Sequence, residues 1–129
     1  MEGEMANDCC TSGGSTMILA CSGGSNVGQL SNQAAVELTR EGVGKMFCLA
    51  GIGGQLNGFV QSARDVPGMV VIDGCSLGCA KASLEQAQVP MRTYLVLTDL
   101  GIEKNKELIP KPEEVQRVKE AVKEALAQG

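Results

Sequence analysis

Short apolar runs alternate with longer amphipathic segments along most of this chain of 129 residues. Runs of this length, bounded by glycine, proline and polar residues, predict β-strands. They occupy residues 17–20, 46–50, 69–72 and 93–97. Because each run is apolar on both faces, the strands are expected to lie in a parallel sheet that is covered on both sides.

The segments that follow these runs predict helices. They are residues 26–40, 56–63, 76–88 and the stretch that begins at Pro112. Gly42 and Gly44 end the first of them, and Val89-Pro90 ends the third. The last segment carries Val115, Val118 and Val122 on one stripe, so it is predicted to dock against the rest of the fold.

The resulting order, β-α-β-α-β-α-β-α, predicts an α/β fold. We expect a three-layer Rossmann-like or flavodoxin-like sandwich with a mainly parallel four-stranded sheet. Residues 1–15 are rich in Gly, Ser, Asn and Asp and are predicted to form a flexible N-terminal tail. Residues 16–129 are predicted to form a single α/β domain, which is long enough to bury a core without disulfides.

Charge and composition exclude several kinds of partner. The net charge is −4 and the chain has no run of Lys or Arg, which argues against nucleic acid. No apolar stretch approaches the length of a membrane span. The first residues have neither the basic nor the apolar segment of a secretory signal, so we predict a cytoplasmic protein with reduced thiols.

The chain has six cysteines and no histidine, so any metal site must use sulfur and oxygen ligands. Cys21, Cys48 and Cys75 are spaced by 27 residues and again by 27 residues, each at or just after the end of a predicted strand. In a parallel sheet of order 2-1-3 these ends meet at one edge. If a helix begins at Ser76, Cys79 lies one helical turn further along it, on the face toward that edge. Four thiolates there predict a zinc site, against the alternative that each is an inert buried cysteine.

Other polar groups at the same edge are open to more than one interpretation. Asp73 and Asp99 are interpreted as helix caps or hydrogen-bond partners of the ligands in preference to being ligands themselves. The glycine loop after Cys21 lacks the Lys and Ser or Thr of a phosphate loop, since Gln29 and Leu30 stand there. Cys9 and Cys10 are either extra ligands, a redox switch or an incidental pair.

Several segments resemble the DGC domain, a family named after an Asp-Gly-Cys motif. They are Cys21–Gln29 (CSGGSNVGQ), Cys48–Gly53 (CLAGIG), Asp73-Gly74-Cys75, Cys79-Ala80-Lys81 and Leu97–Ile102 (LTDLGI). The resemblance covers about residues 16–105. It implies a zinc-binding domain with four chelating cysteines, which match Cys21, Cys48, Cys75 and Cys79.

The leading hypothesis is therefore a zinc-binding protein, with zinc either structural or used to handle metals or thiophilic ligands. One alternative is a thiol redox enzyme that uses Cys75 and Cys79, although their spacing is not the Cys-x-x-Cys of thioredoxins. Another is an iron–sulfur carrier, because four thiolates also suit such clusters. No set of residues specifies a reaction, so the sequence favours a binding role over an enzyme.

Overall fold

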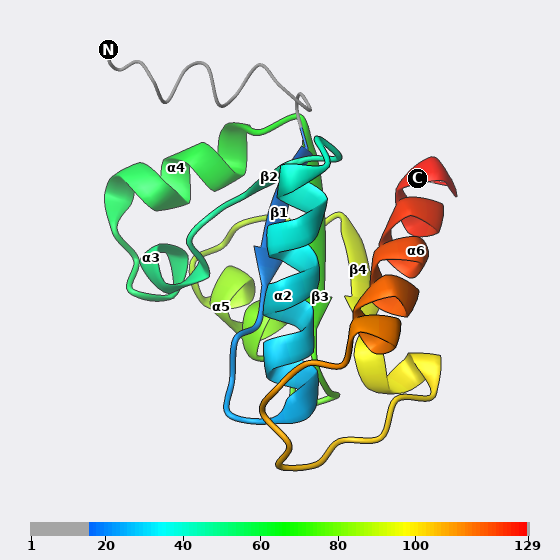
Figure 1. Cartoon of the computed structure of the whole chain (residues 1–129). Coiled ribbons are helices and arrows are strands. Elements are labelled where there is room, and N and C mark those ends of the chain that lie inside the picture. Colours follow the sequence, from blue (N-terminus) through cyan, green and yellow to red (C-terminus); the bar gives the residue numbers. More distant parts are fainter. Residues whose placement is uncertain (1–15, 129) are drawn as a thin grey trace.

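The sheet of the computed structural model, which describes residues 16–128, has four strands that all run parallel. The strands are β1 (Thr16–Ala20), β2 (Lys45–Met46), β3 (Gly68–Asp73) and β4 (Thr93–Val96). Their order is β2-β1-β3-β4, which contains the 2-1-3 order assumed for the cysteine site and extends it with β4 (Figure 1). The predicted α/β class is confirmed as well.

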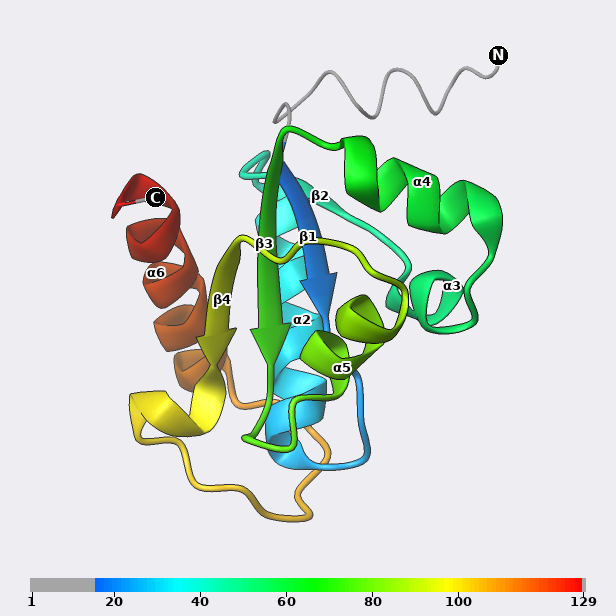
Figure 2. The ribbon, with the colours of Figure 1, turned by 180° about the vertical axis from the view of Figure 1, so that it is seen from behind.

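Helices cover both faces of this sheet, and alternate strand residues point to each layer (Figures 1 and 2). On one face lie α2 (Asn26–Arg40) and α6 (Pro112–Gln128), packed on Ile18 and Ile72. The other face carries α3 (Leu49–Gly53), α4 (Asn57–Asp65) and α5 (Cys79–Gln86), whose core includes Leu19 and Val71. The chain therefore forms the predicted three layers.

Helix α2 has the boundaries that the sequence predicts, because local groups set both of its ends. The Ser25 hydroxyl accepts a hydrogen bond from the Gly28 N–H at 3.2 Å and so caps the first turn. After Glu41 the chain turns through Gly42, whose φ of 83° suits glycine. Helix α6 also starts at Pro112, as predicted.

The predicted strand at residues 46–50 is wrong beyond Met46. β2 ends there, and Leu49–Gly53 forms the short helix α3, which the sequence did not predict. The helix buries Ile52 completely, and Phe47 packs its ring against Phe59 with centroids 5.5 Å apart. Burial of these apolar side chains on the α4 side favours a turn of helix over two more residues of edge strand.

The third predicted helix corresponds to α5. It begins at Cys79, three residues after the predicted start at Ser76. Gly78 precedes it with a φ of 68°, a left-handed conformation that interrupts helical geometry. Likewise, the predicted last strand ends at Val96, and η1 (Leu97–Leu100) follows as a 3-10 helix. The helix predicted at 56–63 is confirmed as α4.

Between residues 16 and 128, no helix is both long enough and apolar enough to cross a membrane. The tail predicted at residues 1–15, including Cys9 and Cys10, lies outside the described residues.

Candidate metal centre

Three strand ends and the loops that follow them form the carboxyl edge of the sheet. Cys21 directly follows β1, and its N–H donates a hydrogen bond to the Ile72 carbonyl of β3 at 2.9 Å. Cys75 comes two residues after β3 and is half-buried, as is Cys21. Adjacent parallel strands therefore deliver these two thiols to the same edge, as the sequence predicts.

The loop that carries Cys21 is packed closely against the first turn of α2. A Cβ atom on Gly28 would lie 2.5 Å from the Gly23 carbonyl oxygen, so only glycine allows this approach. Gln29 donates hydrogen bonds to the carbonyls of Ser22 and Gly23, both at 3.0 Å. The loop in turn donates the Gly23 N–H to the Cys21 sulfur at 3.4 Å. Such N–H donors stabilise a thiolate.

Gly74 brings the other thiol loop against the same turn of helix. A Cβ atom on Gly74 would lie 2.8 Å from the Val27 carbonyl carbon and 2.9 Å from the Gly28 nitrogen. The backbone of the Asp-Gly-Cys motif thus touches the backbone of α2. Because no side chain separates them, Cys75 is held close to the loop that carries Cys21.

Asp73 fixes the start of α5 and with it Cys79. Its carboxylate is almost wholly buried and accepts hydrogen bonds from the N–H groups of Ala80 at 2.7 Å and Lys81 at 3.0 Å. It also accepts one from the Tyr94 hydroxyl at 2.8 Å. The predicted capping role of Asp73 is confirmed. The expectation that Cys79 lies one turn up is wrong, because Cys79 is the first residue of the helix.

Cys79 lies within electrostatic range of two other thiols. Partial desolvation raises its pKa most, and the charges of Cys21, Asp73 and Cys75 raise it further, while Lys104 lowers it. Cys79 follows Cys75 by four positions, and Cys21 follows the neighbouring strand β1. Three of the four predicted ligands are thus gathered at one edge.

Cys48 follows the carboxyl end of its strand, as predicted, but it lies outside the strand itself. It is exposed and lies immediately before α3, two residues beyond the end of β2. In the described range 16–128, no three Cys, Asp or Glu side chains stand close enough to enclose a metal ion. The four thiols therefore do not form a closed coordination shell in this conformation.

Comparison with known proteins places these residues in a family. The family model of the DGC domain matches residues 17–122. The chain belongs to the DGC family. It is also 39% identical over 88 residues to the anaerobic and virulence modulator AnvM of Pseudomonas aeruginosa, a match that covers 68% of this chain and 67% of that protein. No solved structure matches the chain.

The donor set of this DGC domain suits zinc better than harder metals. The candidate ligands are free thiols, and zinc binds thiolates readily, whereas calcium and magnesium require oxygen. Two of the sulfurs already accept hydrogen bonds, from the Gly23 N–H and from the Lys104 ammonium, each at 3.4 Å. Donors of this kind commonly surround metal-bound ligands. The chemistry of the site fits zinc, although its side chains are spread apart.

Two groups at the edge were not singled out by their local sequence. The first is Lys104, whose ammonium lies 3.4 Å from the Cys75 sulfur. The other is Tyr94, which binds Asp73 from strand β4. Each reaches its partner from more than 20 positions along the chain, at 29 and 21 residues respectively.

Asp99, which was considered with Asp73, lies exposed in η1.

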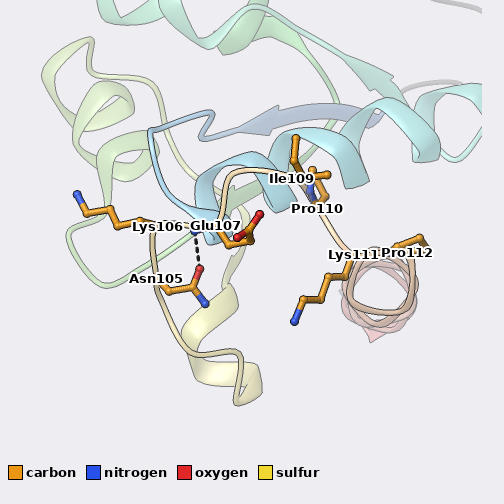
Figure 3. A pocket seen from close by; sticks show the side chains of 7 residues that line it. All are labelled: Asn105, Lys106, Glu107, Ile109, Pro110, Lys111 and Pro112. Carbon is orange, nitrogen blue, oxygen red and sulfur yellow. Dashed lines mark hydrogen bonds between the residues drawn. The ribbon is translucent and has the colours of Figure 1, made fainter.

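Two hollows open on the described part of the molecule, and no thiol lines either of them. A hollow of about 380 Å³ lies beside the turn between Cys75 and Cys79. It is lined by Ser76, Leu77, Gly78, Lys81, Ala82, Glu85, Tyr94 and Val96. A larger one, of about 740 Å³, is formed by residues 105–107 and 109–112 and contains no thiol (Figure 3). The smaller hollow therefore offers the nearer approach to the candidate site.

Proposed function

We propose that this DGC domain binds one zinc ion through Cys21, Cys48, Cys75 and Cys79. The observation that carries the proposal is the close approach of the Cys21 and Cys75 loops, which meet the same turn of α2 at Gly28 and Gly74. A divalent cation would remove the repulsion among these thiolates. Cys48, exposed before α3, would complete the set.

The protein's own residues would prepare this site in three ways. Gly28 and Gly74 allow the two thiol loops to lie against the same helix turn. Asp73 holds Cys79 at the first position of α5. The Gly23 N–H donates to the Cys21 sulfur, and the Lys104 ammonium donates to the Cys75 sulfur. Zinc, when bound, would join the loops after β1, β2 and β3 and stabilise the folded chain.

The role of such a site agrees better with a binding protein than with an enzyme. AnvM is described by its name as a modulator, and a protein of that kind can act through a partner without catalysis. We therefore propose that zinc stabilises the surface around the Cys75–Cys79 turn.

Metal analysis of anaerobically purified protein tests this function. We expect about one zinc per chain in the wild type and its loss in Cys21→Ser, Cys48→Ser, Cys75→Ser and Cys79→Ser. Cys10→Ser changes a cysteine that the proposal does not include, so it is the matched control and should keep its zinc. An absence of bound metal even after zinc is added back would overturn the proposal.

The same preparation separates the two alternatives. An iron–sulfur carrier would be brown, since its cluster absorbs visible light, whereas a zinc protein is colourless. A thiol redox enzyme would instead hold no metal and would form a reversible disulfide between Cys75 and Cys79. These thiols flank a tight turn closed by a hydrogen bond from the Gly78 N–H to the Cys75 carbonyl at 3.1 Å. Mass spectrometry before and after reduction distinguishes that outcome.

A further inference from the structure

The segment of residues 101–111, here named the strap, joins η1 to α6 and passes below the start of α2 (Figure 1). Most of its residues are exposed, but Ile102 is buried in the core beneath α2 and α6. The strap carries three lysines, Lys104, Lys106 and Lys111. Only a specific contact would hold one of these long side chains at a fixed place.

Asn26, at the first turn of α2, fixes the strap on both sides of Lys104. Its side-chain amide donates to the Glu103 carbonyl at 2.7 Å, and its side-chain oxygen accepts from the Asn105 N–H at 2.6 Å. The Asn26 N–H also donates to the Asn105 carbonyl, at 3.1 Å. Asn26 is only 7% exposed, so these hydrogen bonds are largely shielded from water. Leaving them unmade would be costly.

Lys104 is thereby placed against the thiols. Its ammonium group lies 3.4 Å from the Cys75 sulfur, and its charge acts on Cys79 in the direction opposite to that of Cys21, Cys75 and Asp73. The whole chain has a net charge of −4, and zinc with four thiolates would add further negative charge at this edge. A cation at this point would compensate that charge.

We propose that Lys104 is the counter-cation of the sulfur site and that Asn26 is the positioning residue that keeps it there. The part of this inference that concerns zinc affinity rests on the proposed function. The part that concerns positive charge at Cys75 does not, since it applies equally to the metal-free protein. The two parts are therefore tested by separate measurements.

The first measurement compares zinc affinities by chelator competition. We expect Lys104→Gln to weaken zinc binding by about threefold to tenfold. This loss is no larger than the smallest that usually follows removal of a hydrogen-bond partner of a metal ligand, because solvent screens the exposed ammonium. Lys106→Gln makes the same charge change on the strap and should leave the affinity unchanged. The loss should shrink in high salt, since salt screens exposed charges.

A double-mutant cycle tests the role of Asn26. Asn26→Ala should weaken zinc binding in the presence of Lys104 and should add little to Lys104→Gln, because it acts through that lysine. A merely structural role would give additive losses. Asn26→Asp, which keeps the acceptor and removes the donor to Glu103, serves if the alanine variant does not fold.

The second measurement uses metal-free protein and two thiol reagents of different charge, iodoacetate and iodoacetamide. The ratio of the iodoacetate rate to the iodoacetamide rate at one thiol reports the local charge. Both reagents react with the thiolate, so the thiolate fraction cancels in this ratio. We expect the ratio at Cys75 to fall by about threefold in Lys104→Gln, as for the loss of one nearby, solvent-screened unit charge. The ratio at exposed Cys48 should not change. Fragment-ion mass spectrometry separates Cys75 from Cys79 in their tryptic peptide, residues 65–81.

The outcomes separate the two claims. Wild-type protein that binds no zinc would overturn the proposed function, and the reagent ratio would then decide the charge inference. Wild-type protein that binds zinc, with Lys104→Gln and Lys106→Gln alike in both measurements, would overturn the inference and leave the zinc site standing.

Discussion

At the scale of single residues, each member of the Asp-Gly-Cys motif has a different task. Asp73 caps α5, Gly74 permits backbone contact with α2, and Cys75 presents its sulfur at the edge. The first two tasks are structural, and both determine where the sulfurs lie. A change at either position should therefore alter stability and site together.

Gly74→Ala tests the close contact with α2. The new Cβ would meet backbone atoms of Val27 and Gly28 closer than 3.0 Å, and these atoms cannot rotate away as a side chain can. We expect a loss of about 1–3 kcal/mol in the free energy of unfolding, as for overpacking elsewhere. Gly24→Ala is the matched control, because its Cβ would have no neighbour within 4 Å. Equal urea midpoints for the two variants would contradict this account.

Asp73→Asn tests the cap of α5. An amide keeps one acceptor oxygen, so it cannot serve the three donors that the carboxylate now satisfies. We expect a loss of about 2–3 kcal/mol in unfolding free energy, since buried donors are left unpaired. Tyr94→Phe removes one of the three hydrogen bonds and should cost less. Urea unfolding of both variants is the measurement, and a smaller loss for Asp73→Asn would be inconsistent with the cap.

At the scale of elements, one polar contact joins a helix to the sheet and another joins two helices on the opposite face. Tyr94 of β4 binds Asp73, which in turn holds α5. On the opposite face, Lys119 of α6 forms ion pairs with two carboxylates of α2, Glu37 at 3.0 Å and Glu41 at 2.6 Å. Both contacts contain titratable groups, so each predicts a pH dependence of stability.

The β4–α5 contact should weaken in alkali. Burial raises the pKa of Tyr94 above its usual value of 10, and the hydrogen bond to Asp73 and nearby negative charges raise it further. Its contribution to stability is therefore complete below pH 10 and is lost as the pH rises from there toward the folded-state pKa. The chain has one tyrosine and no tryptophan, so phenolate absorbance reports Tyr94 alone. Ionisation of the folded protein at the usual phenol pKa would contradict the contact.

The α2–α6 contact should weaken in acid. A hydrogen bond from Gln33 and then one from Lys119 lower the pKa of Glu37, while Lys119 and then Lys123 lower that of Glu41. Their contribution to stability is present above the usual pKa of 4.5 and is lost as the pH falls below it. Lys119→Met lacks these ion pairs, so its urea midpoint should fall less across this acidic pH range than the midpoint of the wild type. Lys123→Met, which removes only one exposed pair, should change it less.

At the scale of the whole molecule, the three layers and the parallel sheet could be predicted because they follow from local patterns. Apolar runs mark the strands, and Ser25, Gly42 and Pro112 set helix ends through their own backbone preferences. The equal spacing of Cys21, Cys48 and Cys75 likewise reflects the repeated unit of strand and helix. It correctly predicts that Cys21 and Cys75 meet at one edge.

The features that could not be predicted depend on contacts between distant residues. The fold of residues 47–53 depends on packing against α4, and the late start of α5 depends on a carboxylate in β3. The contact between Lys104 and Cys75 depends on Asn26, which is 77 to 79 positions away from its strap partners. Local periodicity contains no information about such pairs. The exposed position of Cys48 depends on the fold of residues 47–53, so it could not be predicted either.

X-ray absorption at the zinc edge tests the central claim most directly, because it counts the sulfur atoms bound to the metal. With zinc-loaded wild-type protein we predict four sulfurs at about 2.3 Å. Three sulfurs and one lighter atom in the wild type would show that one of the four cysteines is not a ligand. A shell composed mainly of nitrogen or oxygen would contradict the four-cysteine site altogether.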